Sequence, residues 1–405
     1  MNTIVQPTVA KDRIVFLDIL RGFALVGILF ANILSWSGLK FLPFIDFIAL
    51  GNFESDTFYY QLLKFFVDTK FYTIFSVLFG VGFYMQLSKQ RDNSGFVNMY
   101  FRRLFLLLII GLLHSFIWSG DILTLYALMG MVLLIIRDVP GKRLLPLALL
   151  LYFFPVLLDI IYMYSFSASL PVKEATALKV YPDMSPTEVV SGFRSSHFIA
   201  VLKTNFHNLV WRWYDFIPTG RPFKVLGLFL LGSYLYHIQF FTKHALKWKY
   251  LFIFVVLGFG FTGLAILMDS HIASFSRTWN DILDRLVHEI GQVSLSLAYI
   301  CILAKLVERF SKFFAFQWLK NYGRMSLTSY LGHTFFGILV FYPIIAFGYF
   351  GMLTLETTFW IAWAILIVQI LISNLWFLAF KFGPVEWLWR CATYKTWIPI
   401  RNLKS

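Results

Sequence analysis

Long apolar stretches, separated by clusters of polar residues, recur along the whole chain. A helix rises about 1.5 Å per residue, so one bilayer crossing takes roughly 20 residues. Ten stretches meet this criterion: 14–36, 70–88, 102–119, 121–137, 143–166, 221–242, 248–268, 288–307, 325–347 and 357–381. Only helices satisfy their backbone hydrogen bonds in lipid without a partner strand. We therefore expect an all-α fold, a polytopic transmembrane helical bundle of about ten spans.

The lysines and arginines indicate how this bundle is oriented. If the N-terminus lies in the cytoplasm, most of the 35 basic residues fall in cytoplasmic segments, as the positive-inside rule requires. Both termini are then cytoplasmic. The first apolar stretch follows Lys11 and Arg13 and has no small-residue cleavage pattern, which favours a retained helix over a signal peptide.

One long polar segment, residues 167–220, interrupts the single transmembrane domain 1–405 and is expected outside the cytoplasm. Within it, Ser185 and Glu188 can open a short helix. The aromatic residues from Phe193 to Phe216 recur as in an amphipathic helix on the outer interface. Loops of this length are often lids or binding elements.

Composition supports lipid as the main solvent of this chain. Of its 405 residues, 59% are hydrophobic and 14% are charged, and the mean hydropathy is +0.71. The net charge of +14 could indicate nucleic acid, but in a membrane protein it usually marks cytoplasmic loops. We therefore expect membrane lipid and no nucleic acid as a partner. The sequence has no phosphate-binding loop and no His or Cys pair with metal-ligand spacing, so no metal site is predicted.

The first apolar stretch contains two charges and a carboxamide. Asp18 and Arg21 lie three residues apart, on one helix face near the cytoplasmic end, and Asn32 follows further along. One interpretation is an ion pair that fastens the helix to its neighbours. The other is an anion site, because a guanidinium offers a two-pronged donor to a phosphate or carboxylate.

His114 and Asp121 form the second polar group. His114 lies about mid-membrane, and Asp121 stands in a short turn before the next stretch. Asp121 is well placed to cap the following helix. An isolated buried histidine usually hydrogen-bonds a neighbour, although its titration range also suits a general base.

The third group opens the ninth stretch. Arg324 and Ser326 precede it, and His333 lies about two turns inside it. Small hydroxyl residues there can cap the helix or allow close helix packing. His333 is nevertheless within reach of a ligand that enters from the cytosol.

Five segments together resemble the YeiB family of bacterial membrane proteins. They are "FLDILRGFALVGILFAN", "KFYTIFSVLFGVGF", "HSFIWSGDILTLYALMG", "GRMSLTSYLGH" and "GPVEWLWR". The opening pattern is also similar to that of wider transmembrane acyltransferases, including acyltransferase-3 enzymes and the heparan glucosamine N-acetyltransferase. The resemblance implies that an acyl group passes from cytosolic acyl-coenzyme A, for example acetyl-CoA, to a sugar across the membrane.

The family's functional residues match this chain unevenly. Arg21 and Gly22 match the shared opening, but Asn32 stands where acyltransferase-3 proteins commonly carry a catalytic histidine. The segment 33–58, where the glucosamine acetyltransferase has its histidine, contains none. The base is therefore unassigned.

We predict a transmembrane acyltransferase of the bacterial inner membrane. It would use acyl-coenzyme A, with a carbohydrate or envelope molecule as acceptor, and a homodimer is a further expectation. The candidate catalytic residues are His114, Asp121 and His333; the candidate cofactor-binding residues are Asp18, Arg21, Asn32, Arg324 and Ser326. The alternative is a transporter or carrier for a small anionic solute, whose path the buried charges would line.

Overall fold

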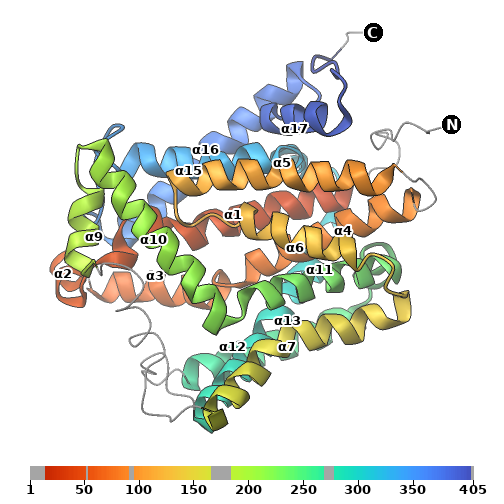
Figure 1. The fold of residues 1–405 in the computed structure, drawn as a ribbon, viewed down its shortest axis with the longest axis horizontal. Coiled ribbons are helices and arrows are strands. Elements are labelled where there is room, and N and C mark those ends of the chain that lie inside the picture. Colours follow the sequence, from red (N-terminus) through yellow and green to blue (C-terminus); the bar gives the residue numbers. More distant parts are fainter. Residues whose placement is uncertain (1–13, 52, 91–94, 166–183, 269–277, 403–405) are drawn as a thin grey trace.

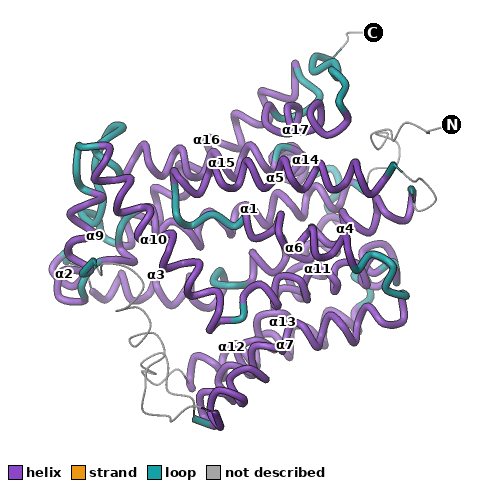
Figure 2. Tube along the Cα trace, in the orientation of Figure 1, coloured by secondary structure: helices purple, strands orange, loops and turns teal. Residues whose placement is uncertain are grey.

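The computed structural model describes residues 14–51, 53–90, 95–165, 184–268 and 278–402, and over these ranges it is an all-α bundle (Figures 1 and 2). The described residues contain no strand, only one isolated bridge between Phe380 and Arg401. The all-α fold expected from the apolar periodicity is therefore confirmed.

The first half of the chain forms eight helical elements. They are α1 (Val15–Trp36), η2 (Leu39–Phe41), α2 (Phe44–Ala49), α3 (Phe53–Phe66), α4 (Lys70–Lys89), α5 (Phe96–Ile117), α6 (Leu123–Ile135) and α7 (Gly141–Ser165). The second half contains α9 (Pro186–Phe193), α10 (Phe198–Thr219), α11 (Arg221–His237), η3 (Phe240–His244), α12 (Trp248–Met268), α13 (Trp279–Arg309), α14 (Phe314–Arg324), α15 (Ser326–Phe341), α16 (Leu355–Ala379) and α17 (Pro384–Tyr394).

Each predicted span coincides with a helix, but the helices differ in length. Seven stretches of the described chain are long and apolar enough to cross a membrane, and one of them, Phe53–Lys89, joins α3 and α4. The helices α6, α11 and α15 have only 13, 17 and 16 residues. Turns limit two of these helices. Helix α6 follows the turn 118–122, and α11 begins after Gly220, whose φ of 58° is left-handed.

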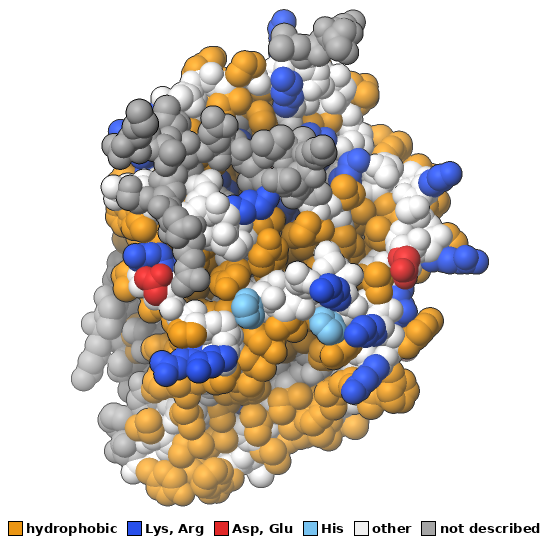
Figure 3. All heavy atoms as spheres, turned by 90° about the vertical axis from the view of Figure 1, so that its right-hand side faces the viewer, with side chains coloured by type: hydrophobic (Ala, Val, Ile, Leu, Met, Phe, Trp, Pro, Cys, Tyr) orange, Lys and Arg blue, Asp and Glu red, His pale blue; other side chains and the backbone are white. Residues whose placement is uncertain are grey.

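The bundle has two distinguishable ends. We name them the α17 end, where α17 lies, and the α9 end, where α2 and α9 lie (Figure 1). Figure 3 looks onto the side of the molecule on the right of Figure 1 and shows many lysine and arginine side chains and few carboxylates. Positive charge therefore predominates on that face.

Part of the segment 167–220 is an ordered piece of the bundle, although residues 166–183 lie outside the described residues. The expected short helix is α9, and Ser185 and Glu188 form a capping box at its start. The amphipathic helix expected after Phe193 is α10. It runs from the α9 end toward the middle of the bundle (Figure 1), and its Asn205 is 3% exposed and accepts a hydrogen bond from the Ser119 amide at 2.7 Å.

Helix α1 is central, whereas α12 is peripheral. Within the protein, 67% of the apolar window of α1 is buried, against 11% for α12. A crossing with α14 brings backbone close to backbone. A Cβ at Gly22 would lie 2.1 Å from the Leu319 carbonyl oxygen, and one at Gly323 would lie 2.0 Å from the Asp18 carbonyl oxygen. The crossing therefore requires glycine at both positions, and it fixes the part of α1 that carries Asp18 and Arg21.

Candidate functional site

A cavity of about 660 Å³ runs beside α1. Its wall follows that helix from Leu17 to Asn32 and continues to Lys40 beyond the helix end. The fifteen residue steps from Leu17 to Asn32 correspond to about 22 Å of helix rise, most of a hydrocarbon core of about 30 Å. The volume is within the range of small-molecule sites. The cavity thus extends across most of the thickness that a bilayer would have.

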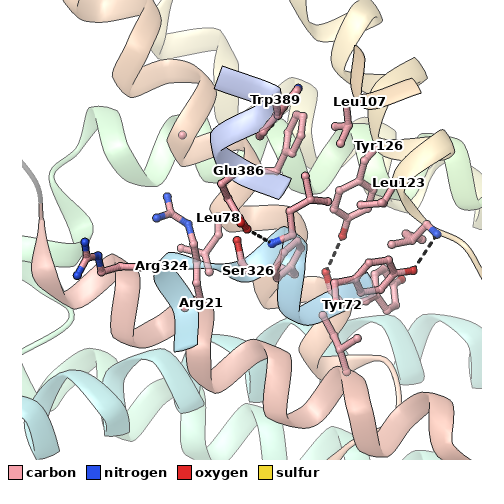
Figure 4. Close-up of a pocket in the computed structure, with 18 of the residues that line it drawn as sticks. Arg21, Tyr72, Leu78, Leu107, Leu123, Tyr126, Arg324, Ser326, Glu386 and Trp389 are labelled. Atoms are coloured by element: carbon pink, nitrogen blue, oxygen red, sulfur yellow. Dashed lines mark hydrogen bonds between the residues drawn. The ribbon is translucent and has the colours of Figure 1, made fainter. Parts of the chain in front are cut away.

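The cavity brings together all five residues predicted to bind a cofactor. Asp18, Arg21, Asn32, Arg324 and Ser326 all line it. Figure 4 shows Arg21 and Arg324 near Ser326 at one end, with Leu123 farther along. Asp18, Arg21, Arg324 and Ser326 lie together because the α1–α14 crossing places the junction between α14 and α15 beside the first turns of α1. Asn32 lines the cavity eleven residues farther along α1 than Arg21. What these residues bind stays a prediction.

Both interpretations of the first charged pair remain compatible with its geometry. Arg21 donates from Nη1 to Asp18 Oδ1 at 2.8 Å, which is the expected ion pair. The Asp18 side chain is 2% exposed, but 24% of the Arg21 side chain is accessible, and both residues line the cavity. The pair therefore fixes the guanidinium at the cavity wall without sealing it from a ligand.

Arg324 is held beside the cavity by α16 and the residues that follow it. Its guanidinium carbon lies 4.0 Å from the centre of the Phe377 ring, and Nη2 donates to the Lys381 carbonyl at 3.0 Å. Lys381 and Arg390 also line the cavity. This end of the cavity is therefore strongly basic.

Glu386 on α17 caps the first turn of α15. Its Oε1 accepts from the amides of Leu327 and Thr328 at 2.6 and 3.0 Å, and Oε2 accepts from the Thr328 hydroxyl at 2.6 Å (Figure 4). Burial raises the pKa of Glu386, although these hydrogen bonds oppose the shift. The sequence suggests an i, i+4 pair with Arg390, but no such pair is among the contacts that the structure gives for Glu386. Its carboxylate instead fastens α17 to the cavity wall.

The middle of the cavity is apolar and aromatic. Leu107 and Leu123 lie away from Arg21 and Arg324 (Figure 4), and Leu78 and Phe79 are also among the lining residues. The Tyr126 hydroxyl donates to the Tyr72 carbonyl at 3.2 Å, so its polar atom is already used (Figure 4). This section suits an alkyl or acyl group better than a charge.

A second group of cations lies at the other end of the cavity. Lys40, Arg212 and Arg221 line it, from η2, α10 and α11. The guanidinium carbons of Arg212 and Arg221 lie 5.5 and 5.7 Å from the centre of the Phe216 ring. Asp68, from the interruption between α3 and α4, lines the same region. Irregular backbone at membrane depth is tolerated where it borders a cavity, and the interruption between α3 and α4 does so here through residues 67–69.

The candidate base His114 is buried beside the cavity and does not line it. Its Nδ1 lies 2.8 Å from Asp121 Oδ1, and its Nε2 lies 2.9 Å from the Thr334 hydroxyl. The order carboxylate, imidazole, hydroxyl is that of a catalytic triad. However, His114 and Thr334 are 4% and 2% exposed. The three side chains have the geometry of a triad, but their burial prevents a substrate from reaching the Thr334 hydroxyl.

Asp121 is both a helix cap and the partner of His114. Oδ1 also accepts from the Leu123 amide at 3.1 Å, and Oδ2 accepts from the Thr124 amide at 2.8 Å. Gly120, Ile122 and Leu123 line the cavity, whereas Asp121 does not. The carboxylate therefore stands directly behind the wall.

His333 lies in a separate buried group. Its Nε2 is 2.6 Å from the Tyr322 hydroxyl, which also donates to Gln369 Oε1 at 3.1 Å. The residue is fully buried and does not line the cavity, and its Nδ1 has no hydrogen-bond partner among the residues that the structure describes. Among the described residues no hydrogen bond joins His333 to His114 or to the cofactor-binding candidates, although the Tyr330 ring lies near both imidazoles, with its centre 6.4 Å from that of His333 and 5.3 Å from that of His114. Its catalytic role stays a prediction.

Sequence reasoning missed the cations at the second end of the cavity. Arg212 falls in the long polar segment 167–220, and Arg221 is the first residue of the apolar stretch 221–242, so the sequence singles out neither as a site residue. The signal available was the dense aromatic stretch "WRWYDFIPTGRP" (211–222), which is unusual for a solvated loop. In the described residues, no group of three or more His, Cys, Asp or Glu side chains could hold a metal ion.

Comparison with known proteins gives relatives of the same length. A family model described as a protein of unknown function (DUF418) matches residues 235–396. The uncharacterized protein YxaH of Bacillus subtilis is 32% identical, with 98% of each chain covered. A 39.9 kDa protein encoded beside an amylase in Bacillus acidopullulyticus is 29% identical, again over 98% of each chain. YeiB of Escherichia coli is 27% identical, over 95% of this chain and 97% of its own. No solved structure matches the chain.

Proposed function

Since the chain belongs to the DUF418 family of YeiB-like proteins, with full-length bacterial relatives, we propose that it is a transmembrane acyltransferase of the bacterial inner membrane. It takes an acyl group from cytosolic acyl-coenzyme A and delivers it to a carbohydrate or envelope acceptor on the other side. In this arrangement the α17 end faces the cytoplasm, in agreement with its basic face (Figure 3).

The continuous cavity along α1 carries this proposal. An acyl-coenzyme A has phosphates at one end, a long arm and a thioester at the other. The cavity has Arg21 and Arg324 at the α17 end, then apolar side chains, and its wall continues to Lys40. The basic end of the cavity would therefore bind the phosphates of the donor, and the apolar section would hold its arm and its acyl group.

Arginine is the appropriate residue at the basic end, because its planar fork matches phosphate oxygens. Asp18 holds Arg21 in place, and the ring of Phe377 supports Arg324. These contacts preorganise two donors that would bind the phosphates. Ser326, at the start of α15, adds a hydroxyl beside them.

Acyl-coenzyme A supplies the activated thioester, and the chain must take the proton from the attacking hydroxyl or amine. His114 remains our candidate for this base, oriented by Asp121 through Nδ1. The side chain between it and the cavity is Tyr330, whose ring centre lies 5.3 Å from that of the imidazole. Tyr330 lines the cavity, so a change of its rotamer would open the way to His114.

Binding of coenzyme A to the purified protein tests the donor site. Arg21→Lys and Arg324→Lys keep the charge but lose the planar fork, and calorimetry should show a Kd about tenfold higher for each, or about 1.4 kcal/mol. Arg309→Lys is the matched control, because Arg309 is exposed at the end of α13 and does not line the cavity. Wild-type affinity in both test variants would contradict the donor site.

A carrier for a small anionic solute is the second candidate. It is favoured by the cations at both ends of one cavity and by the absence of the three candidate catalytic residues from its lining. Flux of an anion into proteoliposomes, driven by membrane potential and undiminished in a folded His114→Ala protein, would favour the carrier. Acetyl transfer from acetyl-CoA that is lost in the same variant would favour the enzyme.

A further inference from the structure

The three cations at the far end of the cavity, Lys40, Arg212 and Arg221, form what we call the far cation cluster. They come from three separate elements, yet all line the cavity and influence one another electrostatically. Arg221 is the charged neighbour that acts most strongly on Arg212. Like charges that act on one another in this way repel, so a physical reason is needed for three cations to line one end of the cavity.

Partners within the protein do not supply that reason. No hydrogen bond or ion pair joins Lys40, Arg212 or Arg221 to another of the residues that the structure describes. The Nε atoms of both arginines are buried without an acceptor. Buried donors left unpaired are costly, as are uncompensated charges. Asp68 and Asp215 attract Lys40, and Asp121 and Asp215 attract Arg212, but among the described residues none of these carboxylates forms a hydrogen bond or an ion pair with a cation of the cluster.

The surroundings suit a ligand rather than bulk solvent. Both guanidinium groups lie against Phe216, which is 4% exposed, and that of Arg221 lies 4.9 Å from the centre of the Tyr72 ring. Aromatic faces fix a guanidinium while leaving its edge donors available. Lys40 is exposed and lines the cavity, so its ammonium group is accessible to a ligand there.

We propose that the far cation cluster binds a phosphate group, and that this phosphate belongs to the acceptor. The inference rests on the proposed acyltransferase and narrows its acceptor to a phosphate-bearing molecule. Two arginine forks and one ammonium group offer the charge and the directed donors that a phosphate needs. The donor's phosphates are assigned to Arg21 and Arg324 at the other end, beyond the apolar section.

Glycerol 1-phosphate tests the site as a soluble probe, with glycerol as its neutral counterpart. A short-chain phosphatidylglycerol tests whether the phosphate must be part of a lipid. Calorimetry on the full-length protein in detergent should give binding of one or both phosphates and none of glycerol. Arg212→Gln and Arg221→Gln should each raise the Kd for phosphate at least tenfold. Lys203→Gln, an exposed cation on the same helix as Arg212, should leave it unchanged.

Coenzyme A binding, measured in the same variants, separates this proposal from the proposed function. It should stay within twofold of wild type in Arg212→Gln and Arg221→Gln. Loss of coenzyme A affinity equal to the loss of phosphate affinity would overturn the proposal, because the cluster would then hold the donor. Unchanged phosphate affinity in both variants would overturn it as well. Phosphate binding through the cluster in a protein that does not bind coenzyme A would support the site and remove the acyltransferase.

Thermal stability distinguishes a ligand site from a structural network. Removing one of three like charges should leave the Tm of the free protein unchanged or raised, and should reduce the rise in Tm that phosphate produces in wild type. Arg212→Lys keeps the charge and should retain part of the phosphate affinity. A lowered Tm in both glutamine variants, without any change in phosphate affinity, would assign the cluster a structural role and refute the proposal.

Discussion

The buried ion pair between Lys224 and Glu289 is expected to hold the beginning of α11 in place. Lys224 lies one turn after Arg221 and donates to Glu289 Oε1 on α13. The Tyr152 hydroxyl, on α7, donates to the other carboxylate oxygen at 2.6 Å. The side chains of Lys224 and Glu289 are 14% and 7% exposed. Three helices therefore meet at one carboxylate.

Removing one member of this pair should cost more than removing both. Lys224→Met leaves the charge of Glu289 buried with the Tyr152 hydroxyl as its remaining side-chain partner, and breaking a buried pair in this way costs about 3–5 kcal/mol. In Lys224→Met/Glu289→Met no charge is left to compensate. The Tyr152 hydroxyl loses the carboxylate but keeps its hydrogen bond to the backbone carbonyl of residue 289, 3.2 Å away, so the loss is about that of one hydrogen bond, roughly 0.5–1.5 kcal/mol. We expect the double variant to be more stable than Lys224→Met.

The free energy of unfolding can be measured by SDS titration of the purified protein in mixed micelles, followed by tryptophan fluorescence. The exposed pair between Arg137 and Asp138, 3.6 Å apart with side chains 32% and 71% exposed, is the control. Its Arg137→Met variant should lose no more than about 1 kcal/mol. If the losses of unfolding free energy in Lys224→Met and in Glu289→Met add up to the loss in the double variant, the pair is not coupled and the reasoning is refuted.

Three further predictions concern one residue of the cavity wall and two residues packed near it. Gly22→Ala should destabilise the protein by more than about 2 kcal/mol, since its Cβ would overlap the α14 backbone; Gly260→Ala, where a Cβ meets nothing within 4 Å, should instead be neutral or slightly stabilising in the same SDS titration. Glu386→Ala should cost about 2 kcal/mol through the lost cap of α15, against no change in the exposed Glu308→Ala. His114→Ala should lower the free energy of unfolding by about 2–4 kcal/mol through two lost buried hydrogen bonds and the space left behind, yet leave coenzyme A affinity at the wild-type value in calorimetry.

The helices could be predicted from sequence because their signal is local. Apolar runs and end signals depend on neighbouring residues, which is why α1 and α16 and the capping box of α9 agree with expectation. The pairing of Asp18 with Arg21 is equally local, since i, i+3 positions share a helix face. Residues that are close in sequence could therefore be placed correctly.

The parts of the site that could not be predicted depend on contacts between distant parts of the chain. Thr334, the second partner of His114, is separated from it by 220 positions. Lys40 and Arg212 meet only because α10 turns into the bundle instead of lying on its surface. A charge-counting rule treats each basic residue as a property of its loop. It therefore has no means of detecting cations that converge on one cavity.

The position of Tyr330 decides how much the burial of His114 matters for catalysis. The Tyr330 hydroxyl accepts one hydrogen bond, from the Ile122 amide at 3.2 Å, and its ring packs on the imidazole. Giving up this hydrogen bond costs about 0.5–1.5 kcal/mol, and losing the aromatic contact costs a similar amount. A state a few kcal/mol above the ground state is populated at roughly 0.1–10%. The free-energy cost of displacing Tyr330 is small beside the barrier of the chemical step. An occupant of the cavity that contacts the displaced tyrosine would raise the population of the open state further, so access to the base would depend on the substrate itself.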